Sequence, residues 1–346
     1  MYYLKYRPHT IAELDNTAPR ETISQILKGK TLPHAFLFVG HKGTGKTSTA
    51  RIVAKAVNCL NNVFAKKGSS IEPCNTCDHC KAIDGSSFSD VVEMDAASNR
   101  GINEVKELIK ETSLLPMSGK YRVYIIDEVH MITNDGFNAL LKTIEEPPET
   151  VIFILATTNL EKVPKTIQSR CVFIQFGKAK EDEIVHMLSR IVLAEKLTIP
   201  KESLDIISTH CDQSFRDAAK ILEELSLAGN MSPEIVLTKI GIRSKIQLYE
   251  SIHINEKEKI ISWLNEFVQD GGNCPLLMEE ILSDLQYHLL FLHKLSGASI
   301  SPLKFSLKET ILLMKQVNEA YGLIKLSPFP IIPLEVALLE YCDTMK

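Results

Sequence analysis

The stretch "GHKGTGKT", residues 40–47, constrains the fold of this chain more than any other feature. It satisfies the pattern G-x-x-x-x-G-K-T and lies between the apolar run "AFLFV" and the helical pattern "TSTARIVAKAVNCL". A loop between a strand and a helix directs backbone N–H groups and the positive end of the helix dipole at phosphate oxygens. We therefore predict a site for a nucleoside triphosphate. The residues expected to hold it are Gly40, His41, Lys42, Gly43, Thr44, Gly45, Lys46 and Thr47.

A second motif, "RVYIIDEVH", supplies the acidic groups that such a site requires. Lys46 is expected to reach the β and γ phosphates, while the Thr47 hydroxyl and the Asp127 carboxylate bind magnesium. Glu128 follows at a position where its carboxylate can polarise an attacking water. The sequence has no N-K-x-D guanine signature, and it points to no acceptor pocket of the kind a kinase needs. The two motifs together predict a magnesium-dependent ATP hydrolase.

Five short apolar runs between residues 35 and 176 alternate with helical stretches: "AFLFV", "VVEM", "RVYIID", "VIFILATT" and "CVFIQF". Runs that are apolar at every position and separated by helices indicate strands buried on both faces of a mostly parallel sheet. After Gly177 the strand signals stop, and amphipathic helices are expected to the end of the chain. The sequence thus predicts an α/β core followed by helical regions.

The composition narrows the class of protein. The chain has 346 residues, of which 45% are hydrophobic and 24% charged, and its net charge is −4. No apolar run approaches the roughly 18 residues that cross a bilayer, and the N-terminus lacks an apolar signal-peptide core. We therefore expect a cytoplasmic protein with no membrane partner. Domains that coat nucleic acid through bulk electrostatics are strongly basic, so any DNA contact must come from a local patch.

Four of the eight cysteines cluster in a pattern that predicts a metal site. Cys74, Cys77 and Cys80 stand at two successive C-x-x-C spacings, which leaves a tetrahedral ion one ligand short. The nearest upstream cysteine is Cys59, at the end of the helix that follows the phosphate loop; the alternative ligand is His79. His79 is adjacent to Cys80, so the two side chains would diverge, and we favour Cys59. Four protein ligands leave no open position, which predicts structural zinc.

Further short motifs follow in an order that indicates a family. They are "KYRP", "DAASNRGI", "IDEVHM", "FNALLKTIEEPPE", "LATTN", "SRC" and "FRDA", all within residues 1–220. Together with the phosphate loop and the cysteines, this order resembles clamp-loader members of the AAA+ ATPases, most closely the gamma/tau subunits of bacterial DNA polymerase III. The four cysteines also match the zinc ligands of that family, although the loop after the first is longer here. The resemblance implies an AAA+ core at 1–177 with a zinc module at 59–80, a helical lid at 178–242 and an all-α oligomerisation (collar) domain at 243–346.

The resemblance also assigns roles to single residues. Thr158 falls at the sensor 1 position, where a polar side chain senses the γ phosphate or holds the attacking water. Arg170 in "SRC" resembles the arginine finger, which enters the ATP site of the neighbouring subunit. A guanidinium on the transferring phosphoryl group accelerates comparable reactions by about 10³ to 10⁵. Arg216 in "FRDA" falls at the sensor 2 position of the lid. The residues implied to lie near the adenine are Tyr6, Arg7 and Pro8.

The motif "DAASNRGI" leaves two interpretations open. A polar turn that opens the helix "INEVKELIK" could direct backbone amides and Arg100 at a DNA phosphate, and this region faces DNA in related loaders. Gly101 stands where relatives can carry a basic residue, so the contact would be weaker here. The alternative is an N-capped surface helix that makes no contact with DNA.

The family resemblance implies a function. It implies an ATP-hydrolysing subunit of the clamp loader, within the DNA-directed DNA polymerase III holoenzyme, that loads the sliding clamp onto primer-template DNA during replication. The partners implied are subunits of delta and delta-prime type in a hetero-oligomeric ring. Because nothing follows Lys346, we expect a short, gamma-like form.

Two alternatives are kept in view. The first is another AAA+ ATPase that acts on DNA, such as a helicase loader or a branch-migration motor; the cysteine cluster and "SRC" speak against it. The second is a structural clamp-loader subunit that does not hydrolyse ATP. The intact Lys46, Thr47, Asp127 and Glu128 speak against that one.

Overall fold

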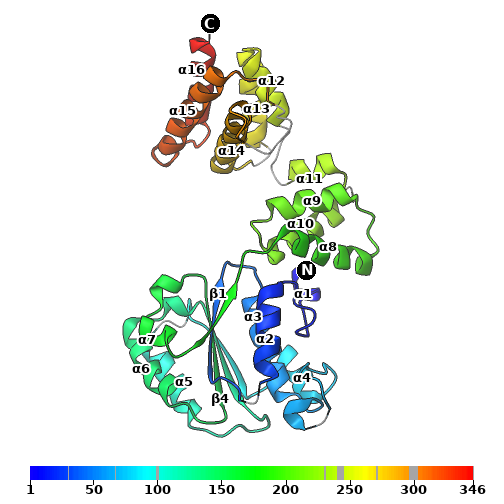
Figure 1. Ribbon diagram of the computed structural model, residues 1–346, viewed down its shortest axis with the longest axis vertical. Helices are drawn as coiled ribbons and strands as arrows, with labels where there is room; N and C mark the ends of the chain where they lie inside the picture. The colour runs from blue at the N-terminus through cyan, green and yellow to red at the C-terminus, as the bar shows by residue number, and fades with distance from the viewer. Residues whose placement is uncertain are drawn as a thin grey trace. The chain divides into compact units, whose positions relative to one another are not determined.

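The computed structural model describes residues 1–29, 31–66, 68–98, 101–229, 231–239, 245–269, 272–295 and 303–345. The chain forms two compact units, Met1–Gly229 and Asn230–Lys346 (Figure 1). The boundary expected at 177/178 lies inside the first unit, and the one expected at 242/243 lies outside the described residues. In the part of the chain that is described, no helix combines the length and the apolar character needed to cross a membrane.

The first unit is built on a parallel sheet of five strands in the order β2-β3-β4-β1-β5. The strands are β1 (Ala35–Gly40), β2 (Val91–Asp95), β3 (Arg122–Asp127), β4 (Val151–Thr157) and β5 (Val172–Phe176). All five predicted strands are confirmed, as is the parallel sheet. Because β4 lies between β1 and β3, the carboxyl ends of these three strands meet at one edge of the sheet, where open α/β folds bind ligands.

The prediction that every strand is buried on both faces is wrong for two of them. All positions of β1 and β4 are buried, and so are all but the last of β3. By contrast β2 and β5 are the two edge strands, and Val172 and Phe173 of β5 are 36% and 45% exposed. An edge strand has a neighbour on one side only, so an apolar run there does not have to be covered on both faces.

Helices cover both faces of the sheet, which makes three layers (Figure 1). One face packs against α2 (Thr17–Leu27) and α3 (Lys46–Asn58), through a core that includes Phe36, Ile52 and Val53. The other face packs against α5 (Ile102–Thr112), α6 (Asn134–Glu145) and α7 (Lys165–Gln168). Alternate strand residues point to the two faces, and each face therefore contributes its own apolar cluster. Short elements complete the layers: η1 (Val63–Ala65), α4 (Asp78–Asp84), η2 (Val129–Met131) and η3 (Leu160–Lys162).

Four helices form the remaining part of the first unit: α1 (Tyr2–Lys5), α8 (Glu181–Glu195), α9 (Lys201–His210) and α10 (Phe215–Ala228). The helix predicted from "EDEIVHMLSRIVLAEK" is α8, with Ile184, Leu188 and Ile191 buried. Ser214 caps α10 by accepting a hydrogen bond from the Asp217 amide, and α10 ends at Gly229, whose φ of +73° suits glycine. The N-terminal helix α1 packs against α10, so the start of the chain is joined to the last helix of this unit.

The second unit is helical throughout its described residues, as predicted. Its elements are α11 (Pro233–Lys239), α12 (Lys245–His253), α13 (Lys257–Gln269), α14 (Cys274–Leu292), α15 (Leu307–Leu323), η4 (Ile324–Leu326) and α16 (Ile332–Thr344). Its core is a separate apolar cluster in which Trp263 and Phe267 stack with ring centroids 5.5 Å apart. Lys245 joins α12 to α14 through ion pairs to Glu280 and Asp284.

Candidate active site and metal centre

The phosphate loop connects β1 to α3 and has the backbone that its glycines allow. Gly43 and Gly45 have φ of +80° and +98°, values that residues with a side chain rarely adopt. The Thr44 hydroxyl donates to the His41 carbonyl at 2.8 Å, which holds the loop closed on itself. Gly45 is the residue before α3, so the free N–H groups of that helix lie directly behind the loop.

Lys46 is almost fully buried, at 6% exposed, on the first turn of α3. Its ammonium donates to the carbonyls of Gly40 and His41, both at 2.8 Å. Burial lowers the pKa of Lys46, an effect that the carboxylates of Glu128 and Asp127 oppose. The ammonium is thus held by two neutral acceptors next to the loop, and a phosphate oxygen would be a stronger acceptor because it carries charge.

The two predicted magnesium ligands meet. The Thr47 hydroxyl donates to Asp127 Oδ2 at 2.6 Å, although the two residues are 80 positions apart in the chain. Asp127 ends β3, and the other oxygen of its carboxylate accepts the Glu128 amide at 2.9 Å. A hydroxyl and a carboxylate oxygen side by side form the kind of hard-oxygen pair that magnesium takes from a protein while keeping its waters. The residues present therefore fit the ion.

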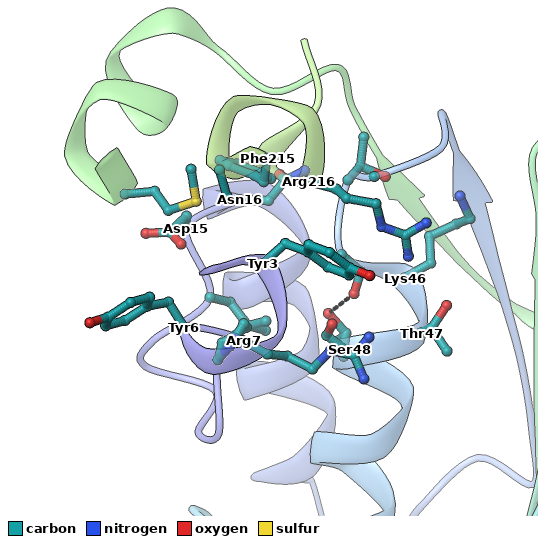
Figure 2. A pocket seen from close by; sticks show the side chains of 18 of the residues that line it. Tyr3, Tyr6, Arg7, Asp15, Asn16, Lys46, Thr47, Ser48, Phe215 and Arg216 are labelled. Carbon is teal, nitrogen blue, oxygen red and sulfur yellow. Dashed lines mark hydrogen bonds between the residues drawn. The ribbon is translucent and has the colours of Figure 1, made fainter. Parts of the chain in front are cut away.

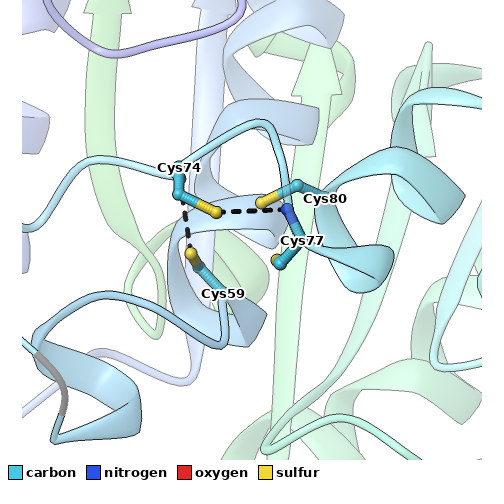
Figure 3. Close-up of side chains that lie close together, drawn as sticks. All are labelled: Cys59, Cys74, Cys77 and Cys80. Carbon is cyan, nitrogen blue, oxygen red and sulfur yellow. Dashed lines mark hydrogen bonds between the residues drawn. The ribbon is translucent and has the colours of Figure 1, made fainter.

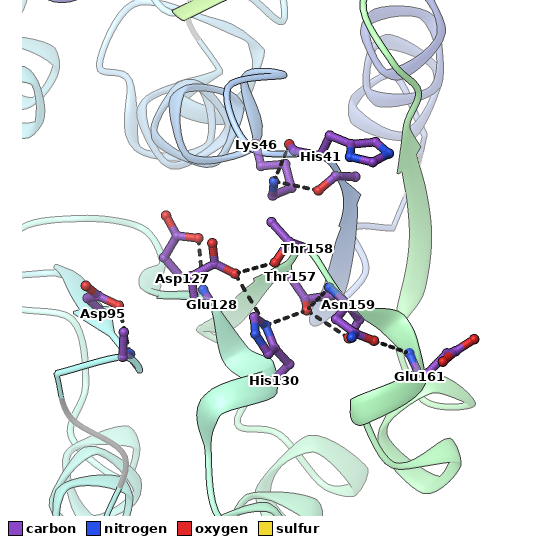
Figure 4. Close-up of polar contacts among 12 residues, drawn as sticks. His41, Lys46, Asp95, Asp127, Glu128, His130, Thr157, Thr158, Asn159 and Glu161 are labelled. Atoms are coloured by element: carbon purple, nitrogen blue, oxygen red, sulfur yellow. Dashed lines mark hydrogen bonds and ion pairs between the residues drawn. The ribbon is translucent and has the colours of Figure 1, made fainter. Parts of the chain in front are cut away.

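Glu128 is held by its neighbours, as Figure 4 shows. Its φ and ψ of 48° and 43° are left-handed, which is uncommon for a residue with a side chain. The Thr158 hydroxyl donates to Glu128 Oε2 at 3.0 Å, so the predicted sensor 1 residue and the predicted base are brought together. His130 Nδ1 lies 3.3 Å from the same oxygen and 3.1 Å from Thr157 Oγ1. The sequence predicted no role for His130, because the motif "RVYIIDEVH" indicates only its two acidic residues.

A pocket extends from the phosphate loop to the N-terminal segment (Figure 2). Tyr6, Arg7 and Pro8 line it, as do Lys46, Thr47, Asp127 and Glu128. Burial lowers the pKa of Arg7, and Arg51 and Arg216 add to this effect. The pocket also contains residues for which the sequence predicted no role in a site: Tyr2, Tyr3, Leu14, Asp15, Asn16, Pro19, Met187, Ile191, Phe215 and Ala219. These residues come from three separate segments of the chain, which only the folded structure brings together.

The predicted sensor 2 residue, Arg216, lies on the first turn of α10 and lines the same pocket. Its guanidinium lies 5.9 Å from the centre of the Tyr3 ring, within the range of a cation–π contact. Helix α10 also touches the phosphate loop directly. A Cβ built on Gly43 would lie 1.9 Å from Ser214 Oγ, so only glycine permits this approach.

Arg170 lies outside this pocket. It follows α7, donates to the Thr166 carbonyl at 2.8 Å and forms an ion pair with Glu145. The structure brings it into no contact with the phosphate loop of its own chain, and its role on a neighbouring subunit stays a prediction. Arg100, the candidate for a DNA contact, lies outside the described residues, so both interpretations of that turn remain open.

The four predicted cysteine ligands form a second site (Figure 3). The sulfur atoms of Cys59, Cys74, Cys77 and Cys80 all lie within 4.8 Å of one another. A tetrahedral ion with Zn–S bonds of about 2.3 Å needs sulfur atoms about 3.8 Å apart, so the set fits such an ion after a small contraction. His79, the alternative ligand, bonds through Nδ1 to the Asn58 carbonyl at 2.9 Å.

The thiols of the cluster differ in acidity. Although burial opposes it, hydrogen bonds from Thr76 and from the Cys77 amide lower the pKa of Cys74 to about 5. Burial and the contact with Cys77 raise the pKa of Cys80. A bound cation would favour the thiolate form of all four sulfurs, since metal ligands must be deprotonated.

The chain is similar in sequence to several known proteins. The sequence model of a family described as "DNA polymerase III, delta subunit" matches residues 16–180. DNA polymerase III subunit tau of Bacillus subtilis is 36% identical over 99% of this chain and 64% of its own length. DNA polymerase III subunit gamma of Buchnera aphidicola subsp. Baizongia pistaciae is 37% identical over 86% of this chain and 79% of its own.

Among solved structures, the Holliday junction branch migration motor RuvB of Thermotoga maritima is similar to 71% of this chain, over 79% of its own. Its TM-score is 0.49 and its identity 17%, a distant likeness. The chain spans less than two thirds of the tau subunit of B. subtilis but about four fifths of the Buchnera gamma subunit. The chain therefore belongs to the gamma/tau subunit family of DNA polymerase III.

Proposed function

We propose that this chain is an ATP-hydrolysing gamma/tau-type subunit of the DNA polymerase III clamp loader. The observation that carries the proposal is the convergence of Lys46, Thr47, Asp127 and Glu128 on a single pocket, with Thr158 bonded to Glu128. These groups come from the start of α3 and from the carboxyl ends of β3 and β4, and each has a role in ATP hydrolysis that its chemistry suits. A subunit that only binds nucleotide would not need Glu128 and Thr158 in contact.

Each side chain contributes a distinct action in this proposal. Lys46 exchanges the carbonyls of Gly40 and His41 for oxygens of the β and γ phosphates. Glu128 orients the attacking water and accepts its proton, while Thr158 keeps the carboxylate in place. Magnesium, when bound at Thr47 and Asp127, supplies positive charge that offsets the charge of the phosphates.

The arginines extend the proposal to an assembly. Arg216 contacts the nucleotide from the lid side of the pocket, and Arg170 acts on the ATP of a neighbouring subunit. Hydrolysis then requires a hetero-oligomeric ring with subunits of delta and delta-prime type. In that ring the chain uses ATP binding and hydrolysis to place the sliding clamp on primer-template DNA in the cytoplasm.

The four cysteines hold zinc in a structural role. Zinc bound by four thiolates has no open position for water, and it supplies folding energy to the segment that carries the ligands. The distance of this cluster from the catalytic groups agrees with that role, since Cys59 and Lys46 stand at opposite ends of α3.

The test is the ATPase rate of a complex reconstituted with partner subunits, measured with and without clamp and primed DNA. We expect both additions to stimulate turnover in the wild type. Lys46→Ala should lower turnover by about 10²-fold or more, because it removes the cation that contacts the transferring phosphate. Turnover that is insensitive to clamp and DNA, or that survives Lys46→Ala, contradicts the proposal.

A further inference from the structure

The pocket has two ends of different chemistry. At one end are the phosphate loop and the polar groups of Lys46 and Thr47. Figure 2 shows Tyr6 and Asp15 at the opposite end, away from Lys46. The lining also includes Pro8, Leu14 and Met187, which add apolar surface. Apolar side chains suit a planar base, while the loop suits phosphates. Residues 6–16, which we call the base-side segment, provide much of this apolar end.

The base-side segment depends on side-chain acceptors for its shape. Residues 6–16, all of which the structure describes, contain no helix or strand. In its middle, the Ile11 amide donates to Glu72 Oε2 at 2.7 Å and the Ala12 amide to Glu72 Oε1 at 3.1 Å. One carboxylate therefore binds two successive backbone amides, with an ionised acceptor that makes such bonds stronger than neutral ones. Glu72 lies 60 residues away in sequence, two positions before Cys74.

Glu72 belongs to the segment that carries the four cysteines, residues 59–80, which we call the cysteine module, and this module fixes its position. Asn62, which is 1% exposed, donates to the carbonyls of Ala56 and Glu72 at 2.7 and 3.4 Å. Two residues after Glu72, the Cys74 amide donates to the sulfur of Cys59 at 3.3 Å. The backbone that carries the carboxylate is therefore joined to α3 through Asn62, and to Cys59 at the end of that helix through Cys74.

A second set of contacts also connects α3 to the base-side segment. Lys55 of α3 is 1% exposed and its ammonium pairs with Asp84 Oδ1 at 2.8 Å. The same carboxylate lies 3.4 Å from His9 Nδ1, in the base-side segment. The segment is thus held at residues 9–12 by two carboxylates, Glu72 from the cysteine module and Asp84 from the end of α4, and neither lines the pocket.

We propose that Glu72 is a positioning residue for nucleotide binding, through which the cysteine module sets the shape of the base-side end of the pocket. This inference rests on the proposed ATP site but concerns affinity for the nucleoside part of the ligand. Loss of Glu72 frees the Ile11 and Ala12 amides and loosens the base-side segment, while the phosphate loop keeps its own hydrogen bonds. The consequence is weaker binding of nucleotides with unchanged binding of bare phosphates.

The experiment compares two probes, ADP and inorganic tripolyphosphate, by calorimetric titration of the full chain. Glu72→Ala should weaken ADP binding about three- to tenfold, and Glu72→Gln, which keeps one acceptor oxygen, should weaken it less. Tripolyphosphate affinity should stay within about twofold of the wild type in both variants. Hydrogen exchange should quicken at the Ile11 and Ala12 amides but not in α3. The matched control is Glu21→Ala, which removes an exposed carboxylate on α2 and should change neither affinity.

Each result decides the inference. If Glu72→Ala weakens the binding of ADP and of tripolyphosphate equally, the variant has lost structure in general and the inference is overturned. An unchanged affinity for ADP also overturns it. If the wild type binds neither ADP nor tripolyphosphate, the proposed ATP site itself fails, and the inference fails with it. If the wild type binds both and Lys46→Ala loses both, the site stands and the Glu72 variants alone decide the inference.

Discussion

The two ends of α3 carry two sites built in different ways. At its N-terminal end, Thr47 meets Asp127 at the end of β3, and Thr158, after β4, bonds to Glu128, so the phosphate end depends on several segments of the sheet. At its C-terminal end, Cys59 meets three cysteines that follow it within a short stretch of chain. The first site brings together residues that are far apart in the sequence. The ligands of the second come from one short segment, whose fold depends on the bound metal. Mutations at the two sites should therefore have different effects. Those at the phosphate end should lower the rate of ATP hydrolysis, and those at the cysteines should lower the free energy of unfolding.

Glu128→Gln should have the largest effect and should act at the phosphate end alone. The amide cannot accept a proton from water, so we expect kcat for ATP hydrolysis to fall by about 10² to 10⁴. Affinity for ATP, metal content and the unfolding temperature should stay as in the wild type, as titration, metal analysis and thermal unfolding would show. A large fall in stability would contradict the separation of the two ends.

Cys74→Ser should act at the other end. Loss of one thiolate should release the metal and lower the free energy of unfolding by on the order of 3 kcal/mol, because metal binding is part of the folding energy of such a module. At saturating ATP the surviving folded protein should keep its kcat. Denaturant unfolding with metal analysis checks this, with Cys171→Ser, outside the cluster, as the control. Loss of kcat in a variant that remains fully folded would give the cysteines a catalytic part.

His130→Ala should lower kcat less than Glu128→Gln does. It tests whether His130 helps to hold the Glu128 carboxylate in place. His130 lies beside the oxygen of Glu128 that Thr158 also contacts, so its loss should let the carboxylate move and lower kcat about tenfold with little change in KM. His130→Asn, which keeps a donor near the position of Nδ1, should recover part of the activity. His293→Ala, at an exposed histidine of the second unit, serves as the control. An equal loss in the Ala and Asn variants would mean that packing, and not the hydrogen bond, matters.

Sequence patterns predicted the features that carry a motif, among them the distant pair Thr47 and Asp127, and missed those that depend on the fold alone. The five strands, the phosphate loop and the cluster of four cysteines could be predicted because a few neighbouring residues determine each of them. The exposure of β5 could not be predicted, because it depends on the strand order and not on the apolar run itself. Likewise Glu72 and Tyr3 carry no motif, and their places follow only from which segments the fold brings together.

The contact between Gly43 and Ser214 has a consequence for the order of events in a cycle. Because no side chain separates the phosphate loop from α10, there is no free space between them for the loop to move into. A shift of the loop toward α10 as a phosphate enters would therefore press on Ser214, and so on the start of the helix that carries Arg216. A chain of phosphates that carries no base would press on the same helix as a complete nucleotide.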